Sequence, residues 1–121
     1  MEIVICPDAV QAGRLGADAI TTLIRRKPDG VLGLATGSSP LGIYDELARR
    51  HEAGELSFAN ARGFTLDEYV GLATEHPETY HNVIRKDFVN RVDFADGAVR
   101  GPDGLSDDIP AFCRSYEEAI A

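Results

Sequence analysis

The stretch Val31-Leu32-Gly33-Leu34-Ala35-Thr36-Gly37-Ser38-Ser39-Pro40-Leu41-Gly42-Ile43-Tyr44 decides the fold of this chain. An apolar run breaks into a loop of small and hydroxyl residues, which passes directly into a helical pattern. We expect a buried parallel strand over 31–35 and a helix over 40–53. Ser39 is a strong candidate for the N-cap, and Pro40 suits the first helical position, where its missing N–H costs no hydrogen bond.

The loop between this strand and helix has the composition of a phosphate-binding site. Gly37 permits a positive φ or a close approach of the backbone. The free amides of a helix start, together with the positive end of its dipole, attract an anion. The loop lacks the lysine of a Walker P-loop and the spacing of a dinucleotide site, so a nucleotide is not the favoured ligand. An ordinary strand-to-helix turn is the alternative interpretation.

Apolar periodicity predicts alternating strands and helices along the rest of the chain. We expect strands over 3–6 and 61–66, a short extended piece at 98–100, a helix capped by Asp8 that ends at 27–30, and helices over 78–90 and from Ile109 onward. The βαβαβ order predicts an α/β fold with a parallel sheet in a single domain over 1–121. The apolar stripe of the last helix still runs at Ala121, so we expect this architecture to be incomplete at the C-terminus.

The composition narrows the class of protein. A formal net charge of −8 opposes non-specific binding to nucleic acid or to anionic membranes. No apolar stretch approaches the ~20 residues that span a bilayer, and no signal peptide is visible, which predicts a cytoplasmic protein. Cys6 and Cys113 are predicted to be buried thiols. The three histidines lack metal-ligand spacing, so no metal site is expected.

A pair of carboxylates, Asp67 and Glu68, directly follows the strand at 61–66. Because ligands of parallel sheets bind beyond the carboxyl ends of the strands, this pair and the loop 36–39 are expected at one rim. A phosphate anchor beside a carboxylate suits proton abstraction next to the carbonyl of a phosphorylated metabolite. A solvated loop or a helix cap is the alternative interpretation of the pair.

Three segments, 32–40, 64–72 and 76–81, resemble in order and spacing the N-terminal half of the glucosamine-6-phosphate deaminases. The resemblance runs along essentially the whole chain. It implies a Rossmann-like parallel sheet sandwiched by helices. It also implies an enzyme of amino-sugar metabolism, classed as a hydrolase, that converts glucosamine 6-phosphate and water to fructose 6-phosphate and ammonia without a metal or organic cofactor.

The same resemblance assigns roles to individual residues. It makes Asp67 the base that moves a proton between C2 and C1 of the ring-opened sugar. Glu68 is expected among the substrate-binding residues and, with Tyr69, in positioning the loop. Tyr69 stands where the related 6-phosphogluconolactonases typically carry arginine, which favours the deaminase. The phosphate site is expected to comprise Thr36, Gly37, Ser38 and Ser39.

The second half of the family supplies the ring-opening histidine and the basic residues of the phosphate clamp, and none of these lies within 1–121. We therefore expect little activity from the isolated chain, because much of the preorganised electrostatic stabilisation would be absent. A homo-oligomer or a complementing C-terminal half is the expected protein partner. The alternative functions are a non-catalytic sugar-phosphate-binding module and a 6-phosphogluconolactonase-like hydrolase.

Overall fold

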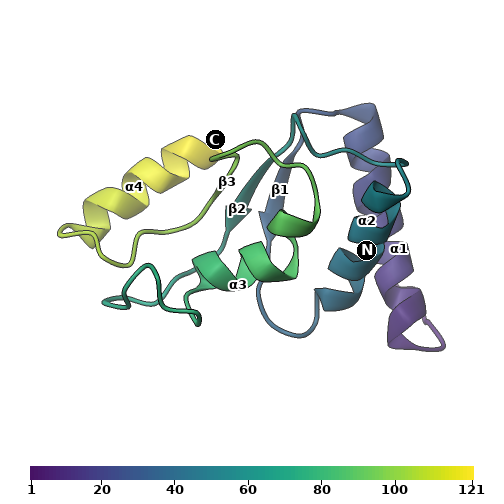
Figure 1. Ribbon diagram of the computed structural model, residues 1–121, viewed down its shortest axis with the longest axis horizontal. Coiled ribbons are helices and arrows are strands. Elements are labelled where there is room, and N and C mark those ends of the chain that lie inside the picture. The colour runs from purple at the N-terminus through teal and green to yellow at the C-terminus, as the bar shows by residue number, and fades with distance from the viewer.

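A three-stranded parallel sheet forms the centre of the computed structural model, which describes all 121 residues (Figure 1). The strands are β1 (Val31–Leu34), β2 (Arg62–Thr65) and β3 (Val99–Arg100), in that spatial order. Helix α2 (Leu41–Glu52) connects β1 to β2, and α3 (Tyr80–Asp87) with a 3-10 turn at Val89–Arg91 connects β2 to β3. The predicted α/β class with a parallel sheet is confirmed.

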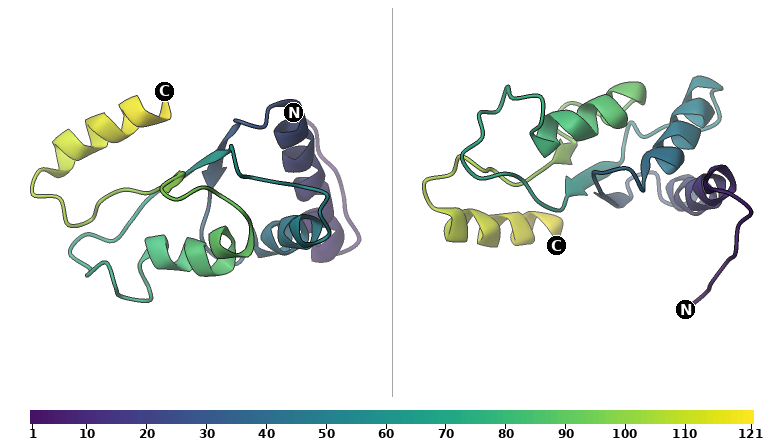
Figure 2. Two further views of the ribbon diagram at one scale, coloured as in Figure 1. Left: turned by 45° about the horizontal axis from the view of Figure 1, so that its top comes forward. Right: turned by 90° about the horizontal axis from the view of Figure 1, so that it is seen from below.

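Helices lie on both sides of the sheet. Helices α2 and α3 cover one face, and α4 (Ile109–Ile120) lies across the other, as the edge-on view shows (Figure 2). Helix α1 (Ala9–Arg26) packs beside α2. On the α4 side, the ring of Tyr116 packs edge-on against Phe64 of β2, with centroids 5.7 Å apart. The face of β1 on this side stays open, as an apolar groove of about 350 Å³ that Ile120 borders.

The main core fills the space between the sheet and the helices α1, α2 and α3. Leu32 and Leu34 point into it, because alternate residues of a strand face the same side. Phe88 stacks on Tyr44 at 4.6 Å between centroids and meets Phe58 edge-on at 5.5 Å. The buried members of this core are Ala17, Ile24, Leu32, Leu34, Tyr44, Leu47, Leu56, Phe58, Ala61, Ile84, Phe88 and Val99.

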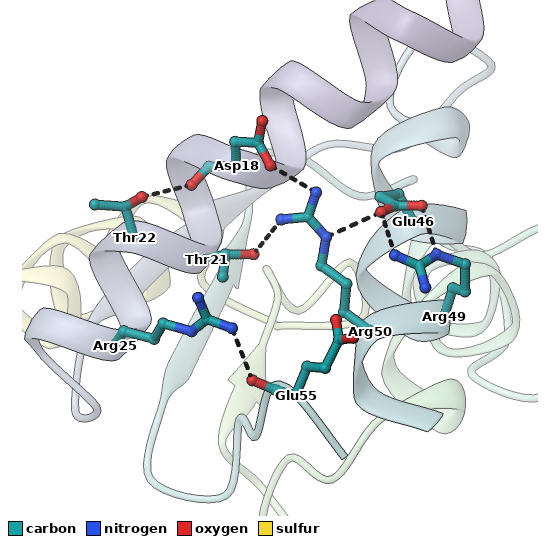
Figure 3. A network of polar contacts seen from close by, with 8 residues as sticks. All are labelled: Asp18, Thr21, Thr22, Arg25, Glu46, Arg49, Arg50 and Glu55. Carbon is teal, nitrogen blue, oxygen red and sulfur yellow. Dashed lines mark hydrogen bonds and ion pairs between the residues drawn. The ribbon is translucent and has the colours of Figure 1, made fainter. Parts of the chain in front are cut away.

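A polar network joins α1 to α2 on the outside of this core (Figure 3). The guanidinium of Arg50 donates hydrogen bonds to Asp18 at 2.6 Å, Thr21 at 2.9 Å and Glu46 at 3.0 Å. Glu46 also accepts two hydrogen bonds from Arg49. Arg50 of α2 is thereby tied to Asp18 and Thr21 of α1, which fixes how α2 lies along α1.

Several predicted element boundaries hold and others do not. Asp8 caps α1 by accepting a hydrogen bond from the Gln11 amide, and Asp108 caps α4 in the same way. The predicted strand over 3–6 is wrong: these residues pair with no strand, and Ile5 is almost fully exposed. β-Branched residues form a strand only where a neighbour accepts their hydrogen bonds and their packing. The predicted helix over 78–90 is shorter and ends in the 3-10 turn.

Two local predictions also need correction. Ser39 is not the N-cap of α2, because Pro40 already has helical φ and ψ and takes the cap position without a side-chain hydrogen bond. The cysteines are not buried: Cys6 is half-buried in the extended N-terminal segment, and Cys113 lies on the exposed side of α4. None of the helices has both the length and the apolar character needed to cross a membrane.

Candidate functional site

Three loops leave the carboxyl ends of the three strands at one edge of the sheet. They begin at Ala35 after β1, at Leu66 after β2 and at Gly101 after β3. Because all three strands are parallel, the loop 36–39 and the carboxylate pair 67–68 share this edge, as predicted from the sequence. The structure therefore brings the two groups of predicted site residues to one rim of the molecule.

The loop 36–39 presents unpaired main-chain donors. The amides of Gly37, Ser38 and Ser39 donate to no group within the chain. Gly37 has φ of 96°, in the left-handed region that favours glycine and turns the chain into α2. Thr36 is half-buried and the next three residues are exposed. Three consecutive free amides at a helix start form an anion-binding arrangement, and the helix dipole adds to its positive potential.

Tyr44 anchors this loop from the second turn of α2. Its hydroxyl donates a 2.6 Å hydrogen bond to the carbonyl of Ala35, where β1 ends. Burial raises the pKa of Tyr44 to about 12, while the bond to Ala35 opposes that rise. The hydroxyl therefore stays protonated, and remains a donor, throughout the physiological range. The loop 36–39 therefore has both of its ends held, at Ala35 where β1 ends and at Tyr44 in α2.

Asp67 carries a free carboxylate on this edge. Its side chain is exposed and makes no hydrogen bond or ion pair within the chain. Two residues before it, the carbonyl of Thr65 accepts a 2.7 Å hydrogen bond from the buried hydroxyl of Tyr116. The same hydroxyl lies 3.2 Å from the carbonyl of Arg100. Burial raises the pKa of Tyr116, so this link between the ends of β2 and β3 stays protonated.

Glu68, in contrast, accepts hydrogen bonds from three main-chain amides. One carboxylate oxygen accepts from the amides of Tyr69 at 2.9 Å and Tyr80 at 3.0 Å, and the other accepts from the amide of His81 at 2.9 Å. Tyr80 and His81 are the first two residues of α3, whose N-cap Thr79 accepts from the Asn82 amide. Glu68 therefore acts as a remote cap of α3, in line with the helix-cap interpretation of the sequence.

A cleft of about 190 Å³ lies between the loops that follow β2 and β3. Neither Asp67 nor the loop 36–39 lines it. Sequence reasoning missed this cleft, because its second wall comes from a Gly/Pro/Asp segment without a chemical motif. The lining residues are Glu68, Leu72, Thr74, Thr79, His81, Gly101, Pro102, Asp103, Gly104 and Leu105.

His81 is the titratable ring of this cleft. Its Nδ1 lies 2.9 Å from a guanidinium nitrogen of Arg85, which has no acceptor of its own, so Nδ1 is the accepting nitrogen. Burial lowers the pKa of His81 and the charge of Arg85 lowers it further, against the opposing effect of Glu68. The sequence, whose histidines lack metal-ligand spacing, did not single out His81. No group of three or more His, Cys, Asp or Glu side chains is placed to hold a metal ion.

Comparison with known proteins shows what this chain is similar to. The chain is 68% identical over 120 residues to a glucosamine-6-phosphate deaminase of Mycolicibacterium smegmatis, covering 99% of this chain and 46% of that protein. A solved monomeric glucosamine-6-phosphate deaminase, described as a missing link of the NagB superfamily, superposes with a TM-score of 0.94 at 37% identity. That match covers 99% of this chain and 50% of the solved one. No family model matches the chain.

A solved 6-phosphogluconolactonase of Thermotoga maritima has a TM-score of 0.75 at 19% identity, over 98% of this chain and 52% of that one, and shares the fold alone. Both relatives of higher identity are named deaminases, so the expected classification as a hydrolase is wrong. The chain spans about half the length of the curated relatives it matches. With 68% identity across nearly all of its residues, the chain resembles about half of a glucosamine-6-phosphate deaminase.

Proposed function

We propose that this chain supplies the phosphate-binding loop and the catalytic base of a cytoplasmic glucosamine-6-phosphate deaminase. The proposed reaction is the deaminating isomerisation of glucosamine 6-phosphate to fructose 6-phosphate and ammonia. One observation carries the proposal: three free loop amides and an unpaired carboxylate lie on one edge of the sheet in a chain 68% identical to a protein of that name.

The phosphate of the sugar is bound by the loop 36–39. The amides of Gly37, Ser38 and Ser39 donate to its oxygens, and the hydroxyls of Thr36, Ser38 and Ser39 supply further donors. The positive end of the α2 dipole also attracts the negative charge of the phosphate. Since this loop holds no lysine or arginine, a cationic partner from outside it would strengthen binding.

Asp67 performs the proton transfer. Its carboxylate removes the proton from C2 of the open-chain sugar. The electron pair of the C2–H bond forms the C1–C2 double bond, and the C1 carbonyl oxygen takes a proton from solvent, which gives an enol-type intermediate. The same group then returns the proton to C1, which leaves a protonated imine at C2. Water adds to C2, and ammonia leaves as the C2 ketone forms. A carboxylate free of internal partners is ready to accept a proton, and an exposed position gives the substrate access to it.

The protein partner is proposed from the coverage of the relatives. Because the chain spans 46% of the M. smegmatis protein, we propose that turnover requires groups from the remaining half of that length. A polypeptide carrying that half, or a continuation of this chain, would complete the site. The solved relative is described as monomeric.

Ammonia release from glucosamine 6-phosphate tests the proposal. The chain is assayed alone and mixed with a polypeptide that carries the remaining half of the relatives' sequence, with Asp67→Asn as the matched variant. We expect release in at least one form, and loss of about 10²-fold or more in Asp67→Asn. No release in either form, or equal release by the variant, would contradict the proposal.

A binding titration tests the phosphate loop separately. Ser39→Asp places a negative charge beside the free amides, so we expect it to abolish saturable binding of glucosamine 6-phosphate. Ser115→Asp makes the same change on the exposed face of α4 and should leave binding as it is. Equal affinities of the two variants would rule out the loop as the phosphate site. Saturable binding by the chain without turnover in any form would instead identify a binding module.

A further inference from the structure

We infer that Glu68 is the positioning residue that holds Asp67 on the rim of the sheet, rather than a ligand of the substrate. The inference rests on the proposed function, since it assigns Asp67 the role of base. The carboxylate of Glu68 accepts three main-chain amides, and that of Asp67 accepts none. Two neighbouring acidic residues therefore have opposite environments: one is bound to the backbone and the other is free to react.

The geometry leaves Glu68 little capacity for a substrate. An ionised carboxylate has about four lone-pair sites, and three of them face amides at 2.9–3.0 Å. Two of those amides open α3, where the dipole favours a negative charge, so that moving Glu68 away would leave them without a partner. The carboxylate is thus more stable against α3 than it would be against a mobile sugar hydroxyl.

The backbone around Asp67 is tied on both sides. Upstream, Thr65 is fixed by the hydroxyl of Tyr116. Downstream, the Gly71 amide donates to the carbonyl of Gly104 at 2.9 Å. A Cβ on Gly104 would lie within contact distance of the Tyr69 carbonyl, so only glycine allows this approach. Glu68 is the nearest of these three anchors, one residue from Asp67, and its hydrogen bonds tie the loop to the first residues of α3, where Tyr69 also contacts Tyr80.

A base held in this way loses little conformational freedom when it meets its substrate. Displacing a reacting group by about 1 Å costs on the order of 10²-fold in rate, because the alignment with the C–H bond is lost. Releasing Glu68 would let the 66–70 segment move while leaving the phosphate loop untouched. The expected kinetic signature is a fall in kcat with little change in KM, since phosphate binding dominates recognition of the ground state.

Three variants separate this role from the alternatives. Glu68→Ala removes all three hydrogen bonds. Glu68→Gln has a side chain of the same length and keeps one acceptor oxygen. This oxygen can accept from two of the amides, so the variant should partly rescue function. Glu75→Gln is the matched control in the same loop, because Glu75 is exposed and makes no hydrogen bond. In the form of the protein that releases ammonia, we expect kcat to fall about 10- to 100-fold in Glu68→Ala and less in Glu68→Gln.

The KM and the pH profile complete the kinetic test. A positioning residue leaves KM within about twofold and preserves the shape of the pH profile of kcat/KM, because it neither binds the substrate nor exchanges a proton with it. A rise in KM at unchanged kcat would show that Glu68 binds the substrate. Loss of one limb of the pH profile in Glu68→Gln would show that it transfers a proton. Either result would overturn the inference.

Amide hydrogen exchange in the 121-residue chain tests the anchor independently of turnover. We expect the amides of Tyr80 and His81 to exchange at least about tenfold faster in Glu68→Ala than in the wild type, with Glu75→Gln unchanged. Absence of ammonia release in the wild type would refute the proposed function alone. Unchanged exchange at Tyr80 and His81 in Glu68→Ala would refute the anchor, whatever the activity.

Discussion

The hydroxyl of Tyr44 donates a 2.6 Å hydrogen bond to the carbonyl of Ala35, nine residues earlier in the chain. This bond joins the second turn of α2 to the end of β1 and encloses the loop 36–39 between its two anchored ends. Stacking of the Tyr44 ring on Phe88 at 4.6 Å fixes the direction of the hydroxyl. The candidate phosphate loop is therefore shaped by a core residue outside it.

Tyr44→Phe removes this hydrogen bond and keeps the aromatic stack. We expect the free energy of unfolding to fall by about 1 kcal/mol, because one hydrogen bond is lost and no cavity forms. Affinity for glucosamine 6-phosphate should fall as well, since the loop gains freedom that binding must remove. Urea denaturation and a binding titration measure the two effects. Loss of stability at unchanged affinity would show that the bond does not shape the loop.

The start of α2 packs against α1 through two glycines. A Cβ on Gly13 would lie 2.8 Å from the carbonyl carbon and oxygen of Gly42, closer than side chains pack. Gly13→Ala must therefore push the helices apart, and we expect it to lower the free energy of unfolding by about 1–3 kcal/mol. Denaturant unfolding measures the loss.

Gly33→Ala is the matched control for this substitution. A Cβ on Gly33 would meet no atom within 4 Å, because that face of β1 borders the open groove. We expect its stability to stay within about 0.5 kcal/mol of the wild type or to rise slightly, since alanine restricts the unfolded chain. If the two variants had equal stability, the close approach of α1 and α2 would not be required.

His81 makes the stability of the folded chain depend on pH near neutrality. Its pKa is lowered from the ordinary value of 6.5, first by burial and then by Arg85. The unfolded state therefore binds a proton more readily, so the stability present above pH 6.5 is lost as the pH falls through the lowered pKa. In His81→Gln, the free energy of unfolding should fall less between about pH 7.5 and 5 than it does in the wild type.

Arg85→Gln tests the cause of this dependence. Removing the guanidinium should raise the pKa of His81 and flatten the slope of stability with pH, without abolishing the effect of burial. Chemical denaturation at several pH values gives the slopes. Identical slopes for wild type, His81→Gln and Arg85→Gln would exclude His81 as the source.

The strands and helices were predictable where the signal is local. Asp8 and the Lys27–Gly30 turn delimit α1, and the apolar run after Gly30 gives β1 to within one residue. The segment 3–6 was not predictable in this way, because a strand depends on a partner rather than on its own composition. Local patterns also placed Ser39 at the helix start, one residue before the position where the backbone becomes helical.

The candidate site was predictable in its location and only partly in its roles. Strand ends followed by polar residues indicated the rim, since parallel strands bring their carboxyl ends together. The pair Asp67 and Glu68 could not be divided into a free and an engaged carboxylate from the sequence. That division depends on Tyr80 and His81, twelve and thirteen residues away, which only the folded loop brings to Glu68.

Glu46 makes the stability of the α1–α2 pair sensitive to acid. Hydrogen bonds from Arg49, and to a smaller extent from Arg50, lower its pKa from 4.5 to about 2, against the opposing effect of burial. The unfolded state protonates first, so the stabilisation is complete above about pH 4.5 and is lost as the pH falls toward 2.

Glu46→Gln should therefore lower the free energy of unfolding at pH 7 by about 1–2 kcal/mol, and the difference from the wild type should shrink steadily below pH 4.5. Glu52→Gln is the matched control, because Glu52 lies in the same helix, is exposed and makes no ion pair; it should change stability by less than about 0.5 kcal/mol. Urea unfolding between pH 7 and 3 measures both. A difference for Glu46→Gln that stayed constant over this range would show that the contact with Arg49 and Arg50 does not depend on its charge.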